Sequence, residues 1–118
     1  MTTYALDTNT LINLIRGNTS VISRYGESLA KKIPIIIPPY VDFEILRGFK
    51  YANATGKEKI YQRLCNNCKI GEMRRDMWIK AADLYSDLRH KGFTVGDADI
   101  LIAAFCIETG CTLVPCKV

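Results

Sequence analysis

The fold is decided in residues 4–17, YALDTNTLINLIRG, where a short strand and a helix meet at one acidic residue. The apolar segment Tyr4–Leu6 predicts a strand, and Asp7 follows it directly with polar residues that favour a helix start. Leucine and isoleucine then recur at helical spacing as far as Gly17, a residue type that commonly ends a helix. We therefore expect the Asp7 carboxylate at the carboxyl end of the first strand.

Strand and helix patterns alternate along the rest of the chain. The isoleucines at 35–37 lie between two prolines and predict a buried strand. The other expected elements are helices over about 20–32 (capped by Ser20), 40–49, 56–68, 75–91 and 99–107, and strands over 69–73 and 112–114. This alternation predicts an α/β domain with a mostly parallel sheet flanked by helices, whose functional crevice lies at the carboxyl ends of the strands.

Two of the expected helices are strongly apolar. Residues 99–107 are apolar on all sides after the first position, which predicts a buried helix. The helix over 75–91 carries an apolar stripe that should face the core: Trp78, Ala81, Ala82, Tyr85 and Leu88.

The composition is that of one folded domain. The 118 residues are 48% hydrophobic and 24% charged, which argues against intrinsic disorder. The longest apolar runs, 33–39 and 100–107, are far shorter than the roughly 18 residues of a membrane span. The first residues lack the basic segment of a secretory signal. We expect a soluble cytoplasmic protein without a membrane partner, whose net charge of +4 is compatible with an anionic partner.

The five cysteines favour reduced thiols, because their number is odd and no signal peptide is evident: Cys65, Cys68, Cys106, Cys111 and Cys116. Cys65 and Cys68 have the spacing of a zinc-binding pair, but a second close pair is missing. His90 is the single histidine, so histidine-dependent nucleophilic catalysis has little support. No glycine-rich nucleotide-binding loop is present.

Three acids lie in strongly apolar surroundings: Asp7, Glu44 and Asp99. Acidic side chains are rarely buried unless they are paired. If these three converge, two charges about 4 Å apart repel by about 4 kcal/mol at an effective dielectric constant of about 20. A shared proton or a divalent cation would offset that repulsion, and a set of carboxylates suits Mg²⁺ or Mn²⁺ better than Zn²⁺.

Each acid also has a purely structural explanation. Asp7 and Asp97 could cap the helices that they precede. Glu44 could pair with Arg47 or Lys50 on an exposed helix face. Asp99 could lie in the first turn of its helix, where the helix dipole favours a negative charge. These alternatives stay open on the sequence alone.

Three segments resemble one known family. ALDTN (5–9), FEILRG (43–48) and GDADILIAA (96–104), in this order, resemble the PIN domain, most closely the VapC-type toxins of bacterial toxin–antitoxin pairs. The resemblance covers nearly the whole chain. It implies a PIN-like, Rossmann-like three-layer sandwich, and an endoribonuclease that depends on Mg²⁺ or Mn²⁺.

The resemblance also implies roles for individual residues. The family's catalytic, metal-binding acids would match Asp7, Glu44 and Asp99. Asp97 would match a position that helps at the metal, and Thr8 and Asn9 would match polar residues that orient the first acid. Since residues two apart do not share a helix face, we expect Asp99 to face the metal and Asp97 to cap the helix or support the site. Arg47 is the candidate for binding the RNA backbone.

The partners implied by the resemblance are RNA, a cognate antitoxin protein and a second copy of the chain in a homodimer. The chain departs from the family at its end, where Thr112–Val114 runs into Pro115 instead of a polar turn and a further strand. We expect residues 1–118 to form one PIN-like domain without the usual C-terminal strand, with a sheet edge that favours pairing with another chain. The alternative function is a catalytically degraded PIN-fold module that binds antitoxin or RNA without cleaving it.

Overall fold

The computed structural model describes residues 2–114, which form a four-stranded parallel sheet. The strands are β1 (Tyr4–Leu6), β2 (Ile35–Ile37), β3 (Lys69–Ile70) and β4 (Thr112–Val114), in the spatial order β3-β2-β1-β4. Every pair is parallel, and Ala5 of β1 lies opposite Ile36 on one side and Leu113 on the other. After β1 the chain therefore builds the sheet in one direction, and returns only at the end to place β4 on the other side of β1.

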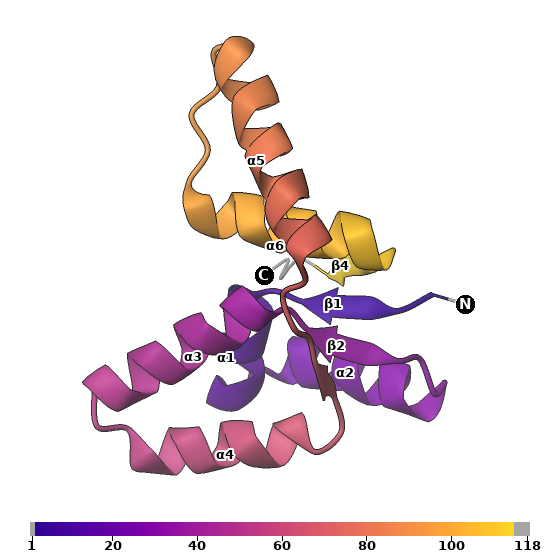
Figure 1. Ribbon diagram of the computed structural model, residues 1–118. Coiled ribbons are helices and arrows are strands. Elements are labelled where there is room, and N and C mark those ends of the chain that lie inside the picture. The colour runs from indigo at the N-terminus through magenta and orange to yellow at the C-terminus, as the bar shows by residue number, and fades with distance from the viewer. Residues whose placement is uncertain (1, 115–118) are drawn as a thin grey trace.

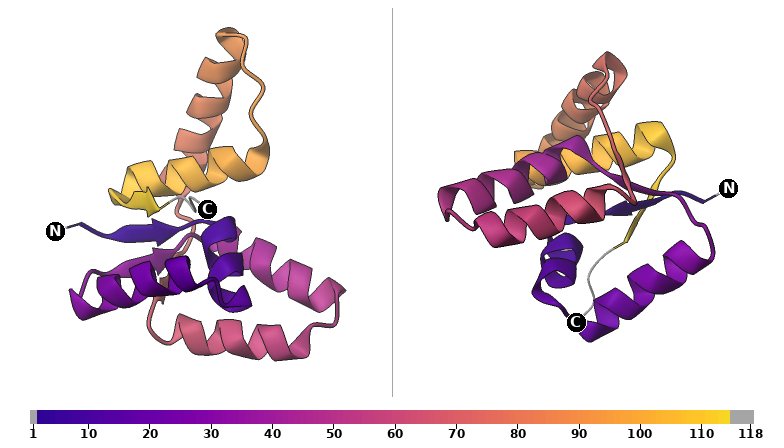
Figure 2. Two further views of the ribbon diagram at one scale, coloured as in Figure 1. Left: turned by 180° about the vertical axis from the view of Figure 1, so that it is seen from behind. Right: turned by 90° about the horizontal axis from the view of Figure 1, so that it is seen from below.

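Helices cover both faces of this sheet. They are α1 (Thr8–Arg16), α2 (Thr19–Ala30), α3 (Pro39–Tyr51), α4 (Thr55–Cys65), α5 (Arg75–His90) and α6 (Asp97–Thr109). Figure 1 shows α1 and α2 on one face and α6 with α5 on the other, with α5 projecting away from the sheet. Figure 2 shows the same layers from behind and from below. The expected α/β sandwich with a parallel sheet is confirmed.

The core lies between the sheet and its helices. The three isoleucines of β2 are all buried, as their β-branched run predicted. Phe105 of α6 and Leu11 of α1 reach the core from opposite faces and are almost completely buried. A smaller cluster of Ala81, Ile100 and Ala104 joins α5 to α6. These two helices therefore share a small apolar core of their own.

Several predicted boundaries were wrong by a few residues. Asn18, not Ser20, caps α2, because its side-chain oxygen accepts a hydrogen bond from the backbone N–H of Val21. α4 ends at Cys65 rather than at Cys68, and β3 ends at Ile70. The ends of α1 were predicted correctly, since Gly17 adopts the left-handed conformation (φ 84°) that ends a helix.

The predicted apolar stripe of α5 is confirmed at Ala81 and wrong at Trp78, Ala82 and Tyr85, which are exposed. Met77 and Ala81 are buried, whereas the side chains of Trp78 and Tyr85 are each 48% exposed. One position along a helix is a rotation of about 100°, so the face that begins at Met77 turns Trp78 away from the core. α6 is buried on only part of its circumference, since Ile107 is 54% exposed.

The expected absence of a further C-terminal strand concerns residues 115–118, including Pro115 and Cys116, which lie outside the described residues. Up to Val114, β4 forms one edge of the sheet. Within residues 2–114, none of the helices is both long and apolar enough to cross a membrane.

Gly71 provides a test of how tightly this core is packed. Its backbone N–H donates to the carbonyl of Ile37 (2.8 Å), and a Cβ at Gly71 would overlap the buried ring of Phe105. We predict that Gly71→Ala lowers the free energy of unfolding by about 1–3 kcal/mol, the usual cost of overpacking. Urea unfolding followed by circular dichroism measures this change.

Gly26→Ala is the matched control for Gly71→Ala. Gly26 lies in α2, and a Cβ there would meet no atom within 4 Å. Alanine should therefore raise the free energy of unfolding by about 0.5–1 kcal/mol, because it favours the helix. Equal stability of the two variants would contradict the packing of α6 against the end of β3.

Candidate active site

Asp7 lies where the topology favours a functional site. It follows β1 directly, and the strand order changes direction between β1 and β4, which is where parallel α/β sheets bind their ligands. The side chain of Asp7 is half-buried, and its Oδ1 accepts a hydrogen bond of 2.8 Å from the backbone N–H of Thr10. Asp7 is thus the N-cap of α1 and is held at the carboxyl end of β1 by the same bond.

Glu44 is joined to the same helix start from another part of the chain. Thr8 Oγ1 donates a hydrogen bond of 2.8 Å to Glu44 Oε1, although the two residues are 36 positions apart. This bond links the first turn of α1 to α3. The structure therefore brings Asp7 and Glu44 together through the residue that follows Asp7, and Thr8 contacts the second acid of the expected set rather than the first.

Arg47 lies next to Glu44, as one of the structural explanations predicted. Its Nη2 is 3.9 Å from Glu44 Oε2, and its guanidinium lies 4.9 Å from the centre of the Phe43 ring. The other candidate partner, Lys50, pairs with Glu58 instead, with Nζ 3.3 Å from Oε2. The Arg47 side chain remains more than half exposed, so it can also meet an anion from solution.

Asp97 and Asp99 both lie in the first turn of α6, and both are exposed. Gly96 is the N-cap of this helix, so the alternative that Asp97 caps α6 is wrong, while its supporting role at the site stays a prediction. Figure 1 shows that α1, α3 and α6 all begin on the same side of the sheet, where β1 and β2 end. The first turn of α6 thus brings two further carboxylates to the side of the sheet on which Asp7 lies.

The four acids do not form a complete metal-binding site among the described residues. Within residues 2–114, no group of three or more histidine, cysteine or acidic side chains is placed so that it could hold a metal ion. Asn9 is exposed, and no hydrogen bond between Asn9 and Asp7 occurs among the described residues. Mg²⁺ is typically held by one or two carboxylates, with water and substrate phosphate completing its shell. The linked pair of Asp7 and Glu44 has the donor chemistry of such an open site.

Thr10 is a site residue that the sequence analysis did not single out. Its backbone N–H holds Asp7, and its Oγ1 donates to the backbone carbonyl of Val114 (3.1 Å). The side chain is 5% exposed, so its hydroxyl needs this partner. The sequence did contain a signal for this role. Thr10 lies three residues after Asp7, and the side chain of an N-cap residue commonly accepts a hydrogen bond from the backbone N–H at that position.

The cysteines of residues 2–114 behave as packing residues. Cys106 is buried, and Cys65 and Cys68 are half-buried. Burial raises the pKa of all three thiols, that of Cys106 to about 11, so they stay protonated near neutral pH. Tyr25 Oη lies 3.5 Å from Cys68 Sγ. Cys116 lies outside the described residues.

The sequence and the fold are similar to those of known proteins. The PIN domain model matches residues 4–116. The structure of VapBC2 from Rickettsia felis, bound to a DNA fragment from its promoter, is similar at 25% identity and a TM-score of 0.87, covering 96% of this chain and 86% of that one. DNA-bound VapBC from Salmonella typhimurium is similar at 21% identity and a TM-score of 0.81, covering 96% of this chain and 83% of that one.

VapBC-1 from nontypeable Haemophilus influenzae is similar at 19% identity and a TM-score of 0.78, covering 94% of this chain and 84% of that one. The sequence has no significant match among proteins of curated function. The similarity in fold therefore spans nearly the whole chain, while sequence identity is low.

The two roles of Asp7 can be separated by substitution. Asparagine is as good an N-cap as aspartate, whereas alanine removes the acceptor. We predict that Asp7→Asn leaves the free energy of unfolding within about 0.5 kcal/mol of that of the wild type, and that Asp7→Ala lowers it by about 1 kcal/mol. Urea unfolding of both variants checks this. A similar large loss in both variants would mean that the charge, rather than the cap, supports the fold.

Proposed function

This chain belongs to the PIN domain family, and from that premise we propose that it is a metal-dependent endoribonuclease acting as the toxin of a type II toxin–antitoxin pair. It would hydrolyse phosphodiester bonds in RNA with Mg²⁺ or Mn²⁺ as its cofactor. VapC-type PIN toxins are generally nucleases, and the similar structures are of VapBC complexes. A cytoplasmic location follows from that role.

The observation that carries the proposal is the bond between Thr8 and Glu44 at the carboxyl end of β1. It holds Glu44 beside the helix start that Asp7 caps, although the two acids come from different helices. One of these carboxylates follows β1, beside which the strand order changes direction, and the other is bonded to the residue after it. Two carboxylates near this end of the sheet support a cation-assisted reaction on a phosphate.

The proposed ligands are Asp7, Glu44 and Asp99, with Asp97 in a supporting position. A bound Mg²⁺ or Mn²⁺ would supply an activated water and would stabilise negative charge on the phosphate. The chain's own residues orient the donors: the Thr10 N–H holds Asp7, and the Thr8 hydroxyl holds Glu44.

Arg47 is the proposed contact for the RNA backbone. Its guanidinium lies beside Glu44 and over the Phe43 ring, so it is held near the site while remaining accessible. A cation in this position attracts a phosphate independently of the base sequence. Thr8 and Asn9 complete the polar edge of the site.

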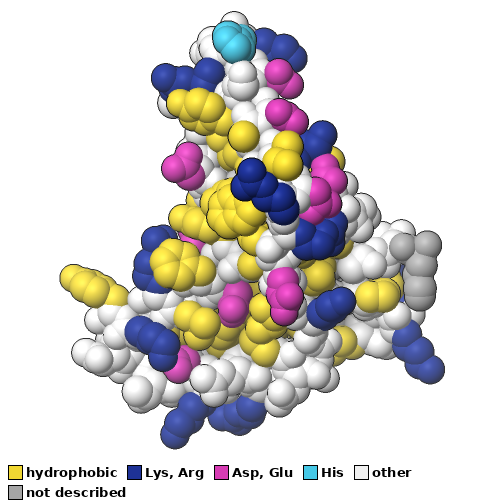
Figure 3. Space-filling model, in the orientation of Figure 1, with side chains coloured by type: hydrophobic (Ala, Val, Ile, Leu, Met, Phe, Trp, Pro, Cys, Tyr) yellow, Lys and Arg dark blue, Asp and Glu magenta, His cyan; other side chains and the backbone are white. Residues whose placement is uncertain are grey.

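The proposed partners are RNA, a cognate antitoxin and a second copy of the chain. Large apolar side chains on and around α5 and α6 support protein contacts, because each is about half exposed: Trp78, Ile79, Tyr85, Phe93 and Ile107. Figure 3 shows hydrophobic side chains gathered over α5. Exposed large apolar side chains that gather on one part of the surface favour interaction sites in soluble proteins.

A second candidate is a degraded PIN-fold module that binds antitoxin or RNA without cleaving it. One observation favours it, namely that the acids within residues 2–114 do not form a group of three that could hold a metal. The two candidates differ in a single measurable property, which is metal-dependent cleavage.

We predict that the wild-type chain cleaves a mixed single-stranded RNA in the presence of Mg²⁺ or Mn²⁺, and that EDTA abolishes cleavage. Asp7→Asn should slow cleavage by about 100-fold or more, because it weakens the hold on the metal ion, and losing one group that stabilises a developing anion costs about that much. Gel analysis of labelled RNA over time measures both effects.

Asp87→Asn is the matched control for Asp7→Asn in the cleavage assay, because Asp87 is exposed on α5 and far from the start of α1. It should cleave at the wild-type rate. A folded wild-type protein that leaves the RNA intact with either metal would favour the binding module instead. Equal activity of Asp7→Asn and wild type would remove Asp7 from the site.

A further inference from the structure

A pocket of about 230 Å³ lies where α1, α3 and α4 meet, and we call it the three-helix pocket (Figure 1). Its walls are mainly apolar and include Ile12, Ile15, Ile45 and Phe49. Pockets for drug-sized ligands have volumes of roughly 300–1,000 Å³, so this smaller one suits a single flat ring system.

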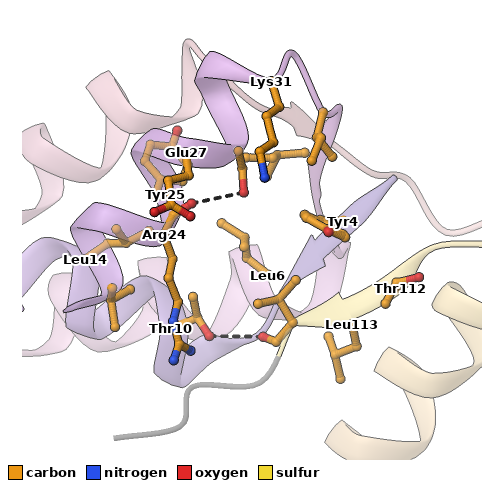
Figure 4. Close-up of a pocket in the computed structure, with 15 residues that line it drawn as sticks. Tyr4, Leu6, Thr10, Leu14, Arg24, Tyr25, Glu27, Lys31, Thr112 and Leu113 are labelled. Atoms are coloured by element: carbon orange, nitrogen blue, oxygen red, sulfur yellow. Dashed lines mark hydrogen bonds between the residues drawn. The ribbon is translucent and has the colours of Figure 1, made fainter. Parts of the chain in front are cut away.

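The three-helix pocket lies wholly within the described part of the chain, since its lining residues fall between Ile12 and Lys57. A larger cavity, of about 410 Å³, lies between α2 and the sheet (Figure 4), and β4, which borders it, ends at the last described residue. No residue of β4 lines the three-helix pocket, which is bounded by α1, α3, α4 and the turn between the last two.

The three-helix pocket adjoins the candidate active site. Glu44, which accepts the hydrogen bond from Thr8, is one of its lining residues. Thr8, Ile12 and Arg16 recur every four residues and share one face of α1. At a rise of about 1.5 Å per residue, Arg16 lies about 12 Å along α1 from Thr8. An RNA strand that is cleaved at the acids would therefore reach the pocket within a few nucleotides.

Gly48 keeps the α3 wall of the pocket open. It lies inside α3, where glycine destabilises a helix relative to alanine. It lines the pocket, and a Cβ added there would meet no atom within 4 Å. Packing therefore does not require a glycine at this position. Its effect is to leave space one helical turn from Glu44, on the same face of α3.

The charges at the pocket favour an anionic occupant. Arg16 and Lys57 line it and are exposed, and neither takes part in an ion pair within residues 2–114. Glu44 is the one acid among the lining residues, and Arg47 lies beside it. Two cations next to an apolar pocket suit an occupant that combines a ring with phosphate groups.

The basic surface continues further along α4. A shallow hollow on this helix is lined by two cations and two amides: Lys59, Gln62, Arg63 and Asn66. Figure 3 shows Lys and Arg side chains along the lower edge of the molecule, where α4 lies. Glu58, the acid of this helix, pairs with Lys50. Such a series of cations suits RNA better than a peptide, because RNA carries a negative charge at every nucleotide.

Phe49 gives the pocket an aromatic wall whose position is fixed. Its ring meets that of Tyr61 edge to face, with the ring centres 6.5 Å apart. Tyr61 is 1% exposed, and its hydroxyl donates to Asp42 Oδ1 (2.7 Å). Single-stranded RNA is commonly bound through unpaired bases that contact aromatic side chains. Phe49 is held in place for such a contact.

We propose that the three-helix pocket is a substrate subsite that takes one unpaired nucleobase of single-stranded RNA. The base enters between α1 and α3 beside Gly48 and contacts Phe49. The phosphates next to this base pair with Arg16 and Lys57. The inference rests on the proposed function, since it places a nucleotide of the same substrate a short way along the strand from the acids.

Binding of labelled RNA in EDTA, followed by fluorescence anisotropy, tests the proposal without cleavage. The probes are a mixed-sequence single-stranded RNA and an abasic strand of the same length and charge. Gly48→Leu fills the pocket from α3 without a change of charge. It should bind the RNA at least about 5-fold more weakly than the wild type does, the usual contribution of one stacked base, and should bind the abasic strand equally well.

Arg16→Gln/Lys57→Gln tests the phosphate contacts. This variant should bind both probes more weakly than the wild type does. The slope of log affinity against log salt concentration should become shallower by about 1.4, which is about 0.7 for each lost phosphate contact with a single strand.

Gly26→Leu is the matched control for Gly48→Leu, because a Cβ at Gly26 in α2 also meets no atom within 4 Å. Lys32→Gln/Lys91→Gln is the control for the charge variant, since both lysines are exposed and lie just after α2 and α5. Both controls should bind both probes as the wild type does. Circular dichroism melting confirms that each variant folds, and Gly48→Met, with a more flexible side chain, replaces Gly48→Leu if leucine prevents folding.

Three results would overturn the proposal: RNA binding by Gly48→Leu that equals that of the wild type, an equal loss of RNA and abasic strand in that variant, or an unchanged salt slope in Arg16→Gln/Lys57→Gln. If a random dodecapeptide pool, and not RNA, loses affinity in Gly48→Leu, the pocket belongs to a protein interface and the proposal is also overturned. A wild type that binds as expected but never cleaves RNA with Mg²⁺ removes the nuclease and leaves the pocket. Cleavage with equal binding by all variants removes the pocket alone.

Discussion

The cap that Asp7 forms on α1 is the interaction on which the rest of the arrangement depends. β1 lies inside the sheet with a parallel neighbour on each side, so the residue that follows it emerges at the point where the strand order changes direction. The bond from the Thr10 N–H fixes the Asp7 carboxylate there and starts α1 in the same step. A shift of this cap by one residue would move both the acid and the helix that carries Thr8.

The parts of the fold that the sequence predicted are those that local signals specify. The β1–α1 unit, the buried isoleucine strand β2 and the extent of α5 follow from periodicity, prolines and caps within a few residues. The errors lie where a neighbour elsewhere in the chain decides. Trp78 and Met77 are both apolar, and the elements packed against α5 determine which of them is buried.

The candidate site shows the same division between local and distant causes. Asp7 could be placed from its own surroundings, because a strand end and a helix start are local features. The hydrogen-bond partner of Glu44 could not be predicted from the sequence. Thr8 is 36 residues away, and Arg47, three residues along the helix, offers a plausible pairing. The structure contains both contacts. Glu44 is therefore held by a neutral donor and lies next to a cation.

Thr10 connects the candidate site to the edge of the described sheet. Its N–H binds Asp7, and its hydroxyl binds the backbone carbonyl of Val114 in β4. The Thr10 side chain is 5% exposed, so its hydroxyl depends on that partner. The position of the Asp7 carboxylate therefore depends on β4 as well as on β1 and α1, and the order of the strands and the cap of α1 specify the same point.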